Sequence, residues 1–410
     1  MQSKKSKKST KRSSPANRAV SPAENSAESE TASRARKLHF DSLVVDTHVD
    51  VAQRCFFENF DFAHRDAEGC LDIPRLREGG VGAIFCAAWV PVDVTGPAAV
   101  KRALDLIDAM REQARRHADD LALAATVTQI RRAHAAGKIA VVLCVEGGHA
   151  IDNDLGILRI FAALGVRYMT LTHIADLDWA GSSAGSGNKG LSAFGGEVIA
   201  EMNRLGMVVD LSHVSDRTFS EVLAITRAPA MASHSCCRAL CDSPRNLTDE
   251  MIRALAAGGG VVQITFHTTF VSQAHAGAHR LHLAECEARA QEIHAQHSGN
   301  QARLLIEEQR LCQAMIGEGK LPRVSWEEIV EHIDHAVQIA GANHVGIGSD
   351  FDGAWMPEGM EDASKLPRIT EALVRRGYAD RDIRKILGEN AVRVLSNAER
   401  VANELAASAV

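Results

Sequence analysis

The stretch Leu-Val-Val-Asp-Thr-His-Val-Asp, residues 43–50, is an apolar run that leads directly into a histidine and a carboxylate. Side chains alternate between two faces along a strand, so His48 and Asp50 are expected on the same side at its end. An imidazole and a carboxylate that converge in this way can share a divalent metal ion. Because chance produces His-x-Asp often, the interpretation of this pair depends on the rest of the chain.

Seven further apolar runs of strand length follow, and amphipathic segments separate them. The runs predict strands at 43–47, 82–89, 139–145, 167–172, 207–212, 229–233, 260–266 and 344–349. The segments between them predict helices, for example at 98–117, 155–164, 194–205, 215–226, 248–257 and 325–340. Ser215 and Thr248 are N-cap candidates, and Ser325 with Glu328 forms a capping-box pattern.

Strands that alternate with helices predict parallel βαβ units, and eight of them predict an α/β fold of the closed (β/α)₈ (TIM) barrel type. The runs are apolar throughout, as expected of strands buried on both faces. An open doubly wound sheet is the alternative, but it would not need site residues from so many strands. Residues 267–322 interrupt the alternation and predict a helical insertion between strands 7 and 8. This insertion is either a lid or dimer contact, or a simple surface insertion.

The charge of the chain is unevenly distributed. Residues 1–38 hold ten Lys/Arg and three Glu, a net charge of +7, against −6 for the whole chain, so the remainder carries −13. Few large apolar residues occur in 1–38, which predicts a disordered basic tail before a folded domain at 39–405. The tail could touch nucleic acid or an anionic surface, but a solvated extension is the simpler interpretation. The acidic remainder argues against nucleic-acid binding as the main function.

Cysteine usage and the absence of export signals bear on the cellular compartment. Nine cysteines occur without a CxxC pair, and neither the apolar core of a secretion signal nor a spanning apolar run is seen. These features predict a cytoplasmic protein with reduced thiols and no membrane anchor.

In a (β/α)₈ barrel the active site lies at the carboxyl ends of the strands. Five candidate metal ligands occur there: His48, Asp50, Glu146, His213 and His234. Five ligands exceed what one zinc ion needs, so they predict two metal ions. Glu146 is the best candidate for a shared ligand, because a carboxylate has two oxygens. Two ions roughly 3.5–4 Å apart can hold and activate a hydroxide between them.

Three further residues are candidates for contact with a substrate. His173 could polarise a carbonyl or stabilise an oxyanion, and Asp350 could pass a proton from water to a leaving amine. Arg245 could bind a substrate carboxylate, or it could pair with Asp242 on the surface. Each histidine could also be purely structural. Supporting or capping roles, or a place in a loop, are expected for Asp46, Asp176, Asp210, Asp352 and His149.

An ordered set of motifs then points to a family. Asp-Thr-His-Val-Asp (46–50), Val-Glu-Gly-Gly (145–148), Leu-Thr-His (171–173), Asp-Leu-Ser-His (210–213), Ala-Ser-His-Ser (232–235), Arg-Asn (245–246) and Gly-Ser-Asp-Phe-Asp-Gly (348–353) resemble the membrane (renal) dipeptidase family, peptidase family M19. The resemblance runs from about residue 40 to 400. It implies a zinc-dependent metallo-dipeptidase, a hydrolase of the amidohydrolase-like barrels, that cuts dipeptides and tolerates a D-residue at the C-terminal position.

The resemblance also implies a role for each site residue. His48 and Asp50 would bind the first Zn²⁺, Glu146 would bridge, and His213 and His234 would bind the second. His173 would contact the substrate or its oxyanion, Arg245 its C-terminal carboxylate, and Asp350 the bridging water. We also expect a homodimer. The alternatives are a lactonase, deaminase or phosphoesterase on the same barrel, a non-catalytic binding protein, and a nucleic-acid binder that acts through its tail.

Overall fold

The computed structural model describes residues 22–187 and 189–408. One nine-stranded parallel sheet organises this part of the chain, in the order β1-β2-β4-β5-β6-β7-β8-β9, with β3 paired to β4 outside that path. The strands are β1 Val44–Val49, β2 Val81–Trp89, β3 Leu121–Leu123, β4 Ile139–Glu146, β5 Val166–Thr170, β6 Val208–Asp210, β7 Met231–Ser235, β8 Val261–Ile264 and β9 Val345–Ile347. All eight predicted strands are present, and β3 is a ninth that the sequence analysis does not predict.

The first strand meets the chain that follows the last, which closes the barrel. Val49 forms an isolated parallel bridge with Phe351. The Asp50 amide donates to the Phe351 carbonyl at 2.9 Å, and the Asp350 amide donates to the His48 carbonyl at 3.0 Å. The predicted (β/α)₈ barrel is confirmed, and an open doubly wound sheet is excluded by this contact between the two ends of the strand order.

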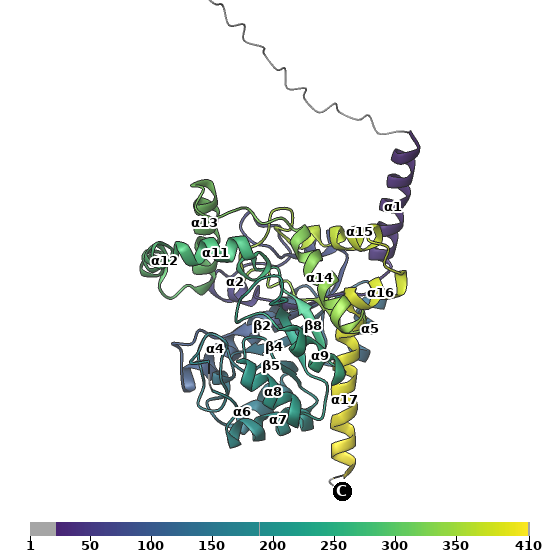
Figure 1. Ribbon diagram of the computed structural model, residues 1–410. Helices are drawn as coiled ribbons and strands as arrows, with labels where there is room; N and C mark the ends of the chain where they lie inside the picture. The colour runs from purple at the N-terminus through teal and green to yellow at the C-terminus, as the bar shows by residue number, and fades with distance from the viewer. Residues whose placement is uncertain (1–21, 188, 409–410) are drawn as a thin grey trace, which may run out of the picture.

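Helices cover the outside of the barrel (Figure 1). Their bounds are α2 Ala52–Phe57, α3 Ile73–Glu78, α4 Pro97–Arg116, α5 Val127–Ala135, α6 Leu155–Ala163, α7 Ala193–Leu205, α8 Asp216–Ile225, α9 Asp249–Ala257, α14 Glu327–Ala340, α15 Pro367–Arg375, α16 Asp380–Arg384 and α17 Asn390–Ser408. Short turns of tighter or wider helix occur at Gly148–Ile151, Ala363–Lys365 and Lys385–Glu389.

Two of the three predicted helix starts are confirmed. The Ser215 side chain caps α8 by accepting from the Thr218 amide, and Thr248 caps α9 by accepting from the Met251 amide. The capping box at Ser325 is wrong, because α14 has its N-cap at Trp326 and the Ser325 hydroxyl bonds to the Glu327 carboxylate instead.

The predicted insertion between β8 and β9 is helical. It contains α10 Thr268–Val271, α11 Gln273–Leu281, α12 Leu283–His297 and α13 Gln301–Gly317. These helices gather at one side of the molecule, away from α1 and α17 (Figure 1). A small separate apolar core joins α12, α13 and the chain that follows α13, and it is formed by Cys286, Cys312, Met315 and Leu321.

The N-terminal part of the described chain is a helix, α1 Pro22–Phe40. Ala35 and Leu38 are buried, α1 packs on α15, and Arg34 pairs with Asp380 at 2.5 Å. Packing against the C-terminal helices thus stabilises the end of α1, although the composition of this segment is polar, and a disordered tail remains a prediction. Residues 1–21 of the predicted tail lie outside the described residues.

The strands themselves are buried, so polar side chains at their ends have little access to water. Every residue of β1, β4, β6, β7, β8 and β9 is buried. Among the described helices, none combines the length and the apolar character needed to cross a bilayer.

Candidate metal centre and active site

The ring of His48, just before the end of β1, is held in one tautomer. Its Nδ1 lies 2.7 Å from the Tyr168 hydroxyl, which donates its own proton to the Thr47 carbonyl at 3.0 Å. The hydroxyl oxygen therefore accepts from Nδ1–H, and Nε2 keeps a free lone pair. That Nε2 atom is buried and makes no hydrogen bond. A buried imidazole nitrogen with a free lone pair is prepared to bind a metal ion.

Glu146, the last residue of β4, lies between three imidazole rings. Its Oε2 is 3.3 Å from His48 Nε2, whereas its Oε1 is 3.0 Å from His213 Nε2 and 3.3 Å from His234 Nε2. The two carboxylate oxygens thus face two different groups of nitrogens. This is the arrangement that a shared carboxylate ligand requires.

His234 is oriented by a hydrogen-bond chain that begins at Asp210. The Ser233 hydroxyl donates to Asp210 Oδ2 at 2.6 Å, and the Ser233 Oγ atom lies 2.8 Å from His234 Nδ1. Because the hydroxyl proton is used on the carboxylate, the serine oxygen accepts from Nδ1–H and leaves Nε2 free. Thr170 donates to Asp210 Oδ2 at 2.5 Å, which completes the supporting contacts of that oxygen. Such outer contacts fix the orientation of metal-binding histidines.

His213 and His234 approach each other unusually closely. Their Nε2 atoms are 2.8 Å apart, and His213 has a left-handed backbone with φ of 67°. Two imidazole nitrogens at this distance need a proton or a cation between or beside them. The strained backbone at His213 is a feature concentrated at functional sites.

Asp50, directly after β1, is the last of the five candidate metal ligands. Asp50 Oδ2 is 3.5 Å from His48 Nε2, and Asp50 Oδ1 is buried with no hydrogen-bond partner. Ligand atoms from His48, Glu146 and His234 lie within 4.8 Å of one another, as do those of Glu146, His173 and His213, and those of His48, Asp50 and Asp350. Imidazole nitrogens with carboxylate oxygens suit zinc, so the residues present fit the metal ions that the sequence predicts.

The electrostatics of the cluster also favour a bound cation. Burial disfavours the ionised form of Glu146, but the charge of His48 and the hydrogen bonds of the three histidines outweigh it and hold its pKa well below the usual value. Burial opposes protonation of His48, yet the charges of Glu146 and Asp50 raise its pKa well above normal. Burial lowers the pKa of His213 and His234, which keeps both rings neutral. Ionised Glu146 and neutral His213 and His234 are in the forms that bind metals, whereas a metal ion at His48 would displace the proton that its raised pKa retains.

His173 follows β5 and points a proton donor toward the centre. Its Nδ1 accepts a hydrogen bond from the Trp89 indole at 3.2 Å, so the ring proton of the neutral form is on Nε2. Burial lowers the pKa of His173 to about 4. A neutral imidazole with Nε2–H directed at the site can donate to an oxyanion.

Asp350 lies at the same edge, on the chain that closes the barrel. Its backbone is left-handed with φ of 68°, and its carboxylate belongs to the group formed with His48 and Asp50. Burial raises its pKa well above the usual value. A carboxylate with a raised pKa beside the metal ligands is suited to accept and return a proton.

Arg245 is buried and does not pair with Asp242, so the surface alternative is wrong. Its guanidinium donates to Ser235 Oγ at 2.9 Å and to the His234 carbonyl at 2.7 Å. Its Nε is buried without a partner. The two hydrogen bonds to β7 hold the cation at the edge of the site, where its charge adds to the effect of burial in lowering the pKa of His213 and His234.

The other carboxylates have the supporting roles expected of them. Asp46 accepts from the Ser349 amide at 2.8 Å, and Asp176 accepts from two amides of the loop after β5. Asp352 accepts from the Cys70 amide at 2.6 Å. His149 lies in the short helical turn after β4, as expected.

Tyr168 is the functional residue that the sequence analysis misses. It is one of two tyrosines in the chain and is fully buried in β5. A tyrosine inside an apolar strand needs a partner for its hydroxyl, and that requirement is the signal that could have identified it.

A cavity of about 620 Å³ does not contain the candidate ligands. It lies between α13, residues 67–70 and residues 356–362. The metal centre is instead a tightly packed cluster at the strand ends.

A (β/α)₈ barrel with buried imidazoles and carboxylates at the carboxyl ends of its strands defines a metal-dependent enzyme. The sequence comparisons give the particular family. The chain belongs to the membrane dipeptidase family, peptidase family M19, whose model matches residues 32–409. It is therefore a hydrolase that acts on dipeptides, and the metallopeptidase family implies bound metal ions.

Similar proteins agree with this assignment. Dipeptidase 3 of Macaca fascicularis is 33% identical over 388 residues, which cover 91% of this chain and 68% of the relative. The probable dipeptidase PvdM from Pseudomonas aeruginosa has a TM-score of 0.77 at 27% identity, over 91% of this chain and 100% of that chain. A metallopeptidase from Rhodobacter sphaeroides, liganded with a phosphinate mimic of the dipeptide L-Ala-D-Ala, has a TM-score of 0.70 at 26% identity, over 87% of this chain and 99% of that chain.

The comparisons confirm the predicted family, barrel and enzyme class. They favour a dipeptidase over a lactonase, deaminase or phosphoesterase, and over a non-catalytic barrel or a nucleic-acid binder. The structure brings His48, Asp50, Glu146, His173, His213, His234, Arg245 and Asp350 to one end of the barrel.

Proposed function

We propose that the protein is a zinc-dependent dipeptidase with two metal ions. His48 and Asp50 would hold one ion, His213 and His234 the other, and Glu146 would be shared. The observation that carries this proposal is the position of Glu146, whose two oxygens face different groups of imidazole nitrogens. Bound there, zinc supplies Lewis-acid activation of the scissile carbonyl and of water near neutral pH.

Arg245 would bind the C-terminal carboxylate of the dipeptide. Its two hydrogen bonds to Ser235 and the His234 carbonyl fix the guanidinium, and its Nε has no partner within the protein. A planar cation with free N–H groups is suited to a carboxylate. The carboxylate contact would set which peptide bond reaches the metal ligands.

His173 and Asp350 would manage the charge and the protons of the reaction. His173 would donate from Nε2–H to the oxyanion, because Trp89 occupies its other nitrogen. Asp350 would take a proton from the attacking water and return it to the nitrogen of the leaving amine, so that the peptide C–N bond breaks and a free amino acid leaves.

L-Xaa-D-Xaa dipeptides are included in the proposed substrate class. The support is the similarity to the Rhodobacter sphaeroides enzyme, which was crystallised with a mimic of L-Ala-D-Ala. Hydrolysis of a panel of L,L and L,D dipeptides, with metal analysis on the same sample, tests both parts of the proposal. We expect turnover of both series with about two zinc ions per chain. Full turnover with less than one metal ion per chain would contradict the two-ion site.

The contact of Arg245 can be tested separately. Amidation of the dipeptide C-terminus removes the negative charge, so we expect kcat/KM of the wild type to fall about 100-fold, near the loss of a charge-assisted hydrogen bond of about 3 kcal/mol. In the Arg245→Lys variant the difference between free and amidated substrates should shrink. An unchanged difference would exclude Arg245 as the carboxylate contact.

We propose that the protein works in a reducing compartment, the cytoplasm. The support is that all nine cysteines are free and buried in the structure. The expected homodimer has one supporting observation: at the junction of α11 and α12, Leu281 is 80% exposed and Leu283 is 42% exposed. Light scattering of the wild type and of Leu281→Ser tests it, and a monomeric wild type would refute it.

A further inference from the structure

The insertion is tied to the metal-site end of the barrel through Glu68, which lies in the loop between α2 and α3. Arg303 of α13 donates to Glu68 Oε2 at 2.6 Å, and Arg310, two turns further along the same helix, bonds to Oε1. Glu307 lies between the two arginines and pairs with both, at 3.1 and 2.6 Å. The hydrogen bond from Arg303 lowers the pKa of Glu68, which keeps it ionised. One carboxylate therefore holds two cations of the insertion.

The loop that carries Glu68 packs closely on Arg54. Arg54 is buried and bonds to the carboxylate of Asp66, two residues before Glu68. At Gly69, immediately after Glu68, an added Cβ would lie 1.7 Å from Arg54 Nη1. The loop can thus lie against the guanidinium only because residue 69 has no side chain. A shift of Glu68 would therefore disturb the contact of Gly69 with Arg54.

Cys70, which follows Gly69, contacts the loop after β9. The Cys70 amide donates to Asp352 Oδ1 at 2.6 Å, and Asp352 has a left-handed φ of 66°. Arg54 Nε and Nη1 and Asp352 Oδ2 are buried without hydrogen-bond partners, so the two opposite charges attract each other in a poorly solvated place. A cavity of about 20 Å³ is lined by Arg54, Glu68 and Asp352 together with Ile306 of α13. The insertion, the loop and Asp352 therefore form one contiguous group.

Asp352 belongs to the same short segment as Asp350. A Cβ at Gly353 would lie 2.1 Å from Asp50 Oδ2 and 2.7 Å from Asp350 Oδ1. The segment thus passes within contact distance of both carboxylates. A displacement of Asp352 by a fraction of an ångström would change the position of Asp350 relative to Asp50.

We propose that Glu68 and Arg54 are positioning residues, which hold the 350–353 segment in place and make the position of Asp350 depend on the docking of α13 through Glu68. This inference rests on the proposed role of Asp350 in proton transfer. Without it, the Glu68 ion pairs are surface contacts that add about 0.2–1 kcal/mol to stability and nothing to turnover.

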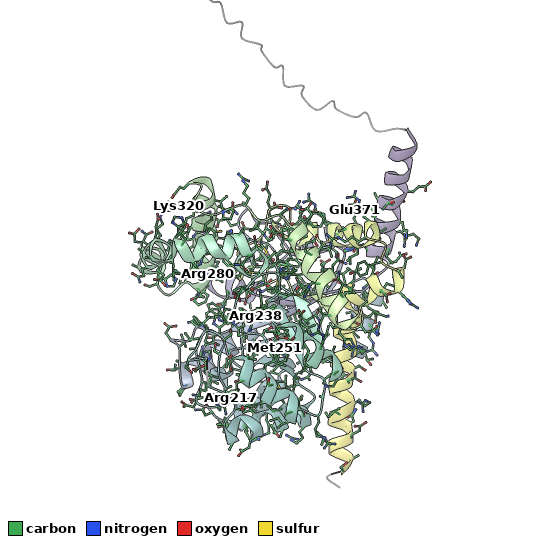
Figure 2. All side chains as sticks on the ribbon, viewed as in Figure 1. Arg217, Arg238, Met251, Arg280, Lys320 and Glu371 are labelled. Carbon is green, nitrogen blue, oxygen red and sulfur yellow. The ribbon has the colours of Figure 1, made fainter. Side chains whose placement is uncertain are left out.

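Glu68→Gln removes the charge but keeps the size of the side chain. Glu285→Gln, in α12 of the insertion, is a matched control, because Glu285 also pairs with two cations, Lys320 and Arg289, and its side chain is 36% exposed against 31% for Glu68. Lys320 lies beside α13 (Figure 2), and within the part of the chain that the structure describes, the ion pairs of Glu285 are to His282, Arg289 and Lys320 and not to the loop that packs on Arg54. Both variants should keep the melting temperature of the wild type.

In the zinc-loaded enzyme we expect Glu68→Gln to lower kcat about ten-fold with KM and zinc content unchanged, a smaller loss than the ~100-fold that a 1 Å misplacement can cause. Amide hydrogen exchange at Cys70 and in residues 350–353 should become about ten-fold faster. Glu285→Gln should change neither. Equal kcat and equal exchange in the two variants would overturn the proposal.

Asp350→Asn, assayed in parallel, separates this inference from the proposed function. If Asp350→Asn keeps its turnover, the role of Asp350 is wrong, although the exchange data still test the link from Glu68 to the 350–353 segment. If Asp350→Asn is impaired while Glu68→Gln matches the control, the role of Asp350 holds and the positioning role of Glu68 is wrong.

Discussion

Asp210 offers the sharpest test of the metal centre, because it acts on the His234 ring through the Ser233 hydroxyl. The carboxylate accepts from the Ser212 and Ser233 amides through Oδ1, at 3.2 and 2.7 Å. It accepts from the Ser233 and Thr170 hydroxyls through Oδ2, at 2.6 and 2.5 Å. Asp210→Asn keeps an oxygen for the two amides and places an NH₂ group before the two hydroxyls.

The substitution should reverse the donor and acceptor roles in the hydrogen bonds that link residue 210, Ser233 and His234. The Asn NH₂ group would donate to the Ser233 oxygen, and the serine would then donate to His234 Nδ1. The ring proton would move to Nε2, which is the nitrogen that must bind the metal. Since outer-contact mutations typically cost 10–100-fold in metal affinity, we expect the affinity of one zinc ion to fall about 30-fold. The hydroxyls of Ser233 and Thr170 would also lose their hydrogen bonds to a charged oxygen, although rotation of the hydroxyls would recover part of this loss. The free energy of unfolding should therefore fall by about 2–4 kcal/mol.

Titration of metal-free protein with Zn²⁺ against a chromophoric chelator measures both affinities. Asp46→Asn is the matched control: Asp46 is similarly buried within β1, and its Oδ1 accepts from the amides of His48 and Ser349, which an Asn oxygen can still do. We expect this control to bind both ions as the wild type does. Two unchanged affinities in Asp210→Asn, or an equal loss at both ions, would refute the tautomer argument.

Three further outcomes follow from buried contacts. Tyr168→Phe removes the acceptor of His48 Nδ1–H and should weaken one zinc ion about 10–100-fold in the same titration; unchanged binding would show that the hydroxyl does not set the tautomer. Burial lowers the pKa of His332 to about 4, below its unfolded value near 6.5, so the unfolded chain binds more protons and stability is lost as the pH falls from about 6.5 to 4. Urea unfolding measured across this pH range gives the slope of the unfolding free energy against pH. In His332→Gln this slope should correspond to up to one bound proton fewer than in the wild type, and an equal slope would contradict the assignment. Phe351→Ala empties a fully buried site at the barrel closure and should cost about 3–5 kcal/mol by denaturant unfolding at constant zinc, with a loss below 1 kcal/mol as the contrary result.

The eight barrel strands could be predicted because strands buried on both faces are continuously apolar in sequence. β3 could not, since Leu121–Leu123 has only three residues and becomes less buried along its length. α1 was also missed, because the contacts that stabilise it come from helices near the other end of the chain.

The candidate ligands could be predicted because each stands at or near the end of a recognisable strand. Their fine geometry could not be predicted in the same way. The left-handed backbones of His213 and Asp350 are not encoded by glycine, and no local pattern announces them. The same holds for Tyr168, whose partner His48 is 120 residues away in the chain.

Because the barrel closes between its first and last strands, the enzyme can become active only late in synthesis. Thr47 and Ile347, hydrogen-bonded across the closure, are 300 residues apart in the chain, so the ribosome must deliver nearly the whole protein before they meet. At about 5–20 residues per second this delay lasts at least some 15 s. During that interval His48 and Asp50 are present but Asp350 is not. A nascent chain that bound a metal ion early would hold it in a site without Asp350. Peptide hydrolysis would therefore begin only after the last strand has joined the first.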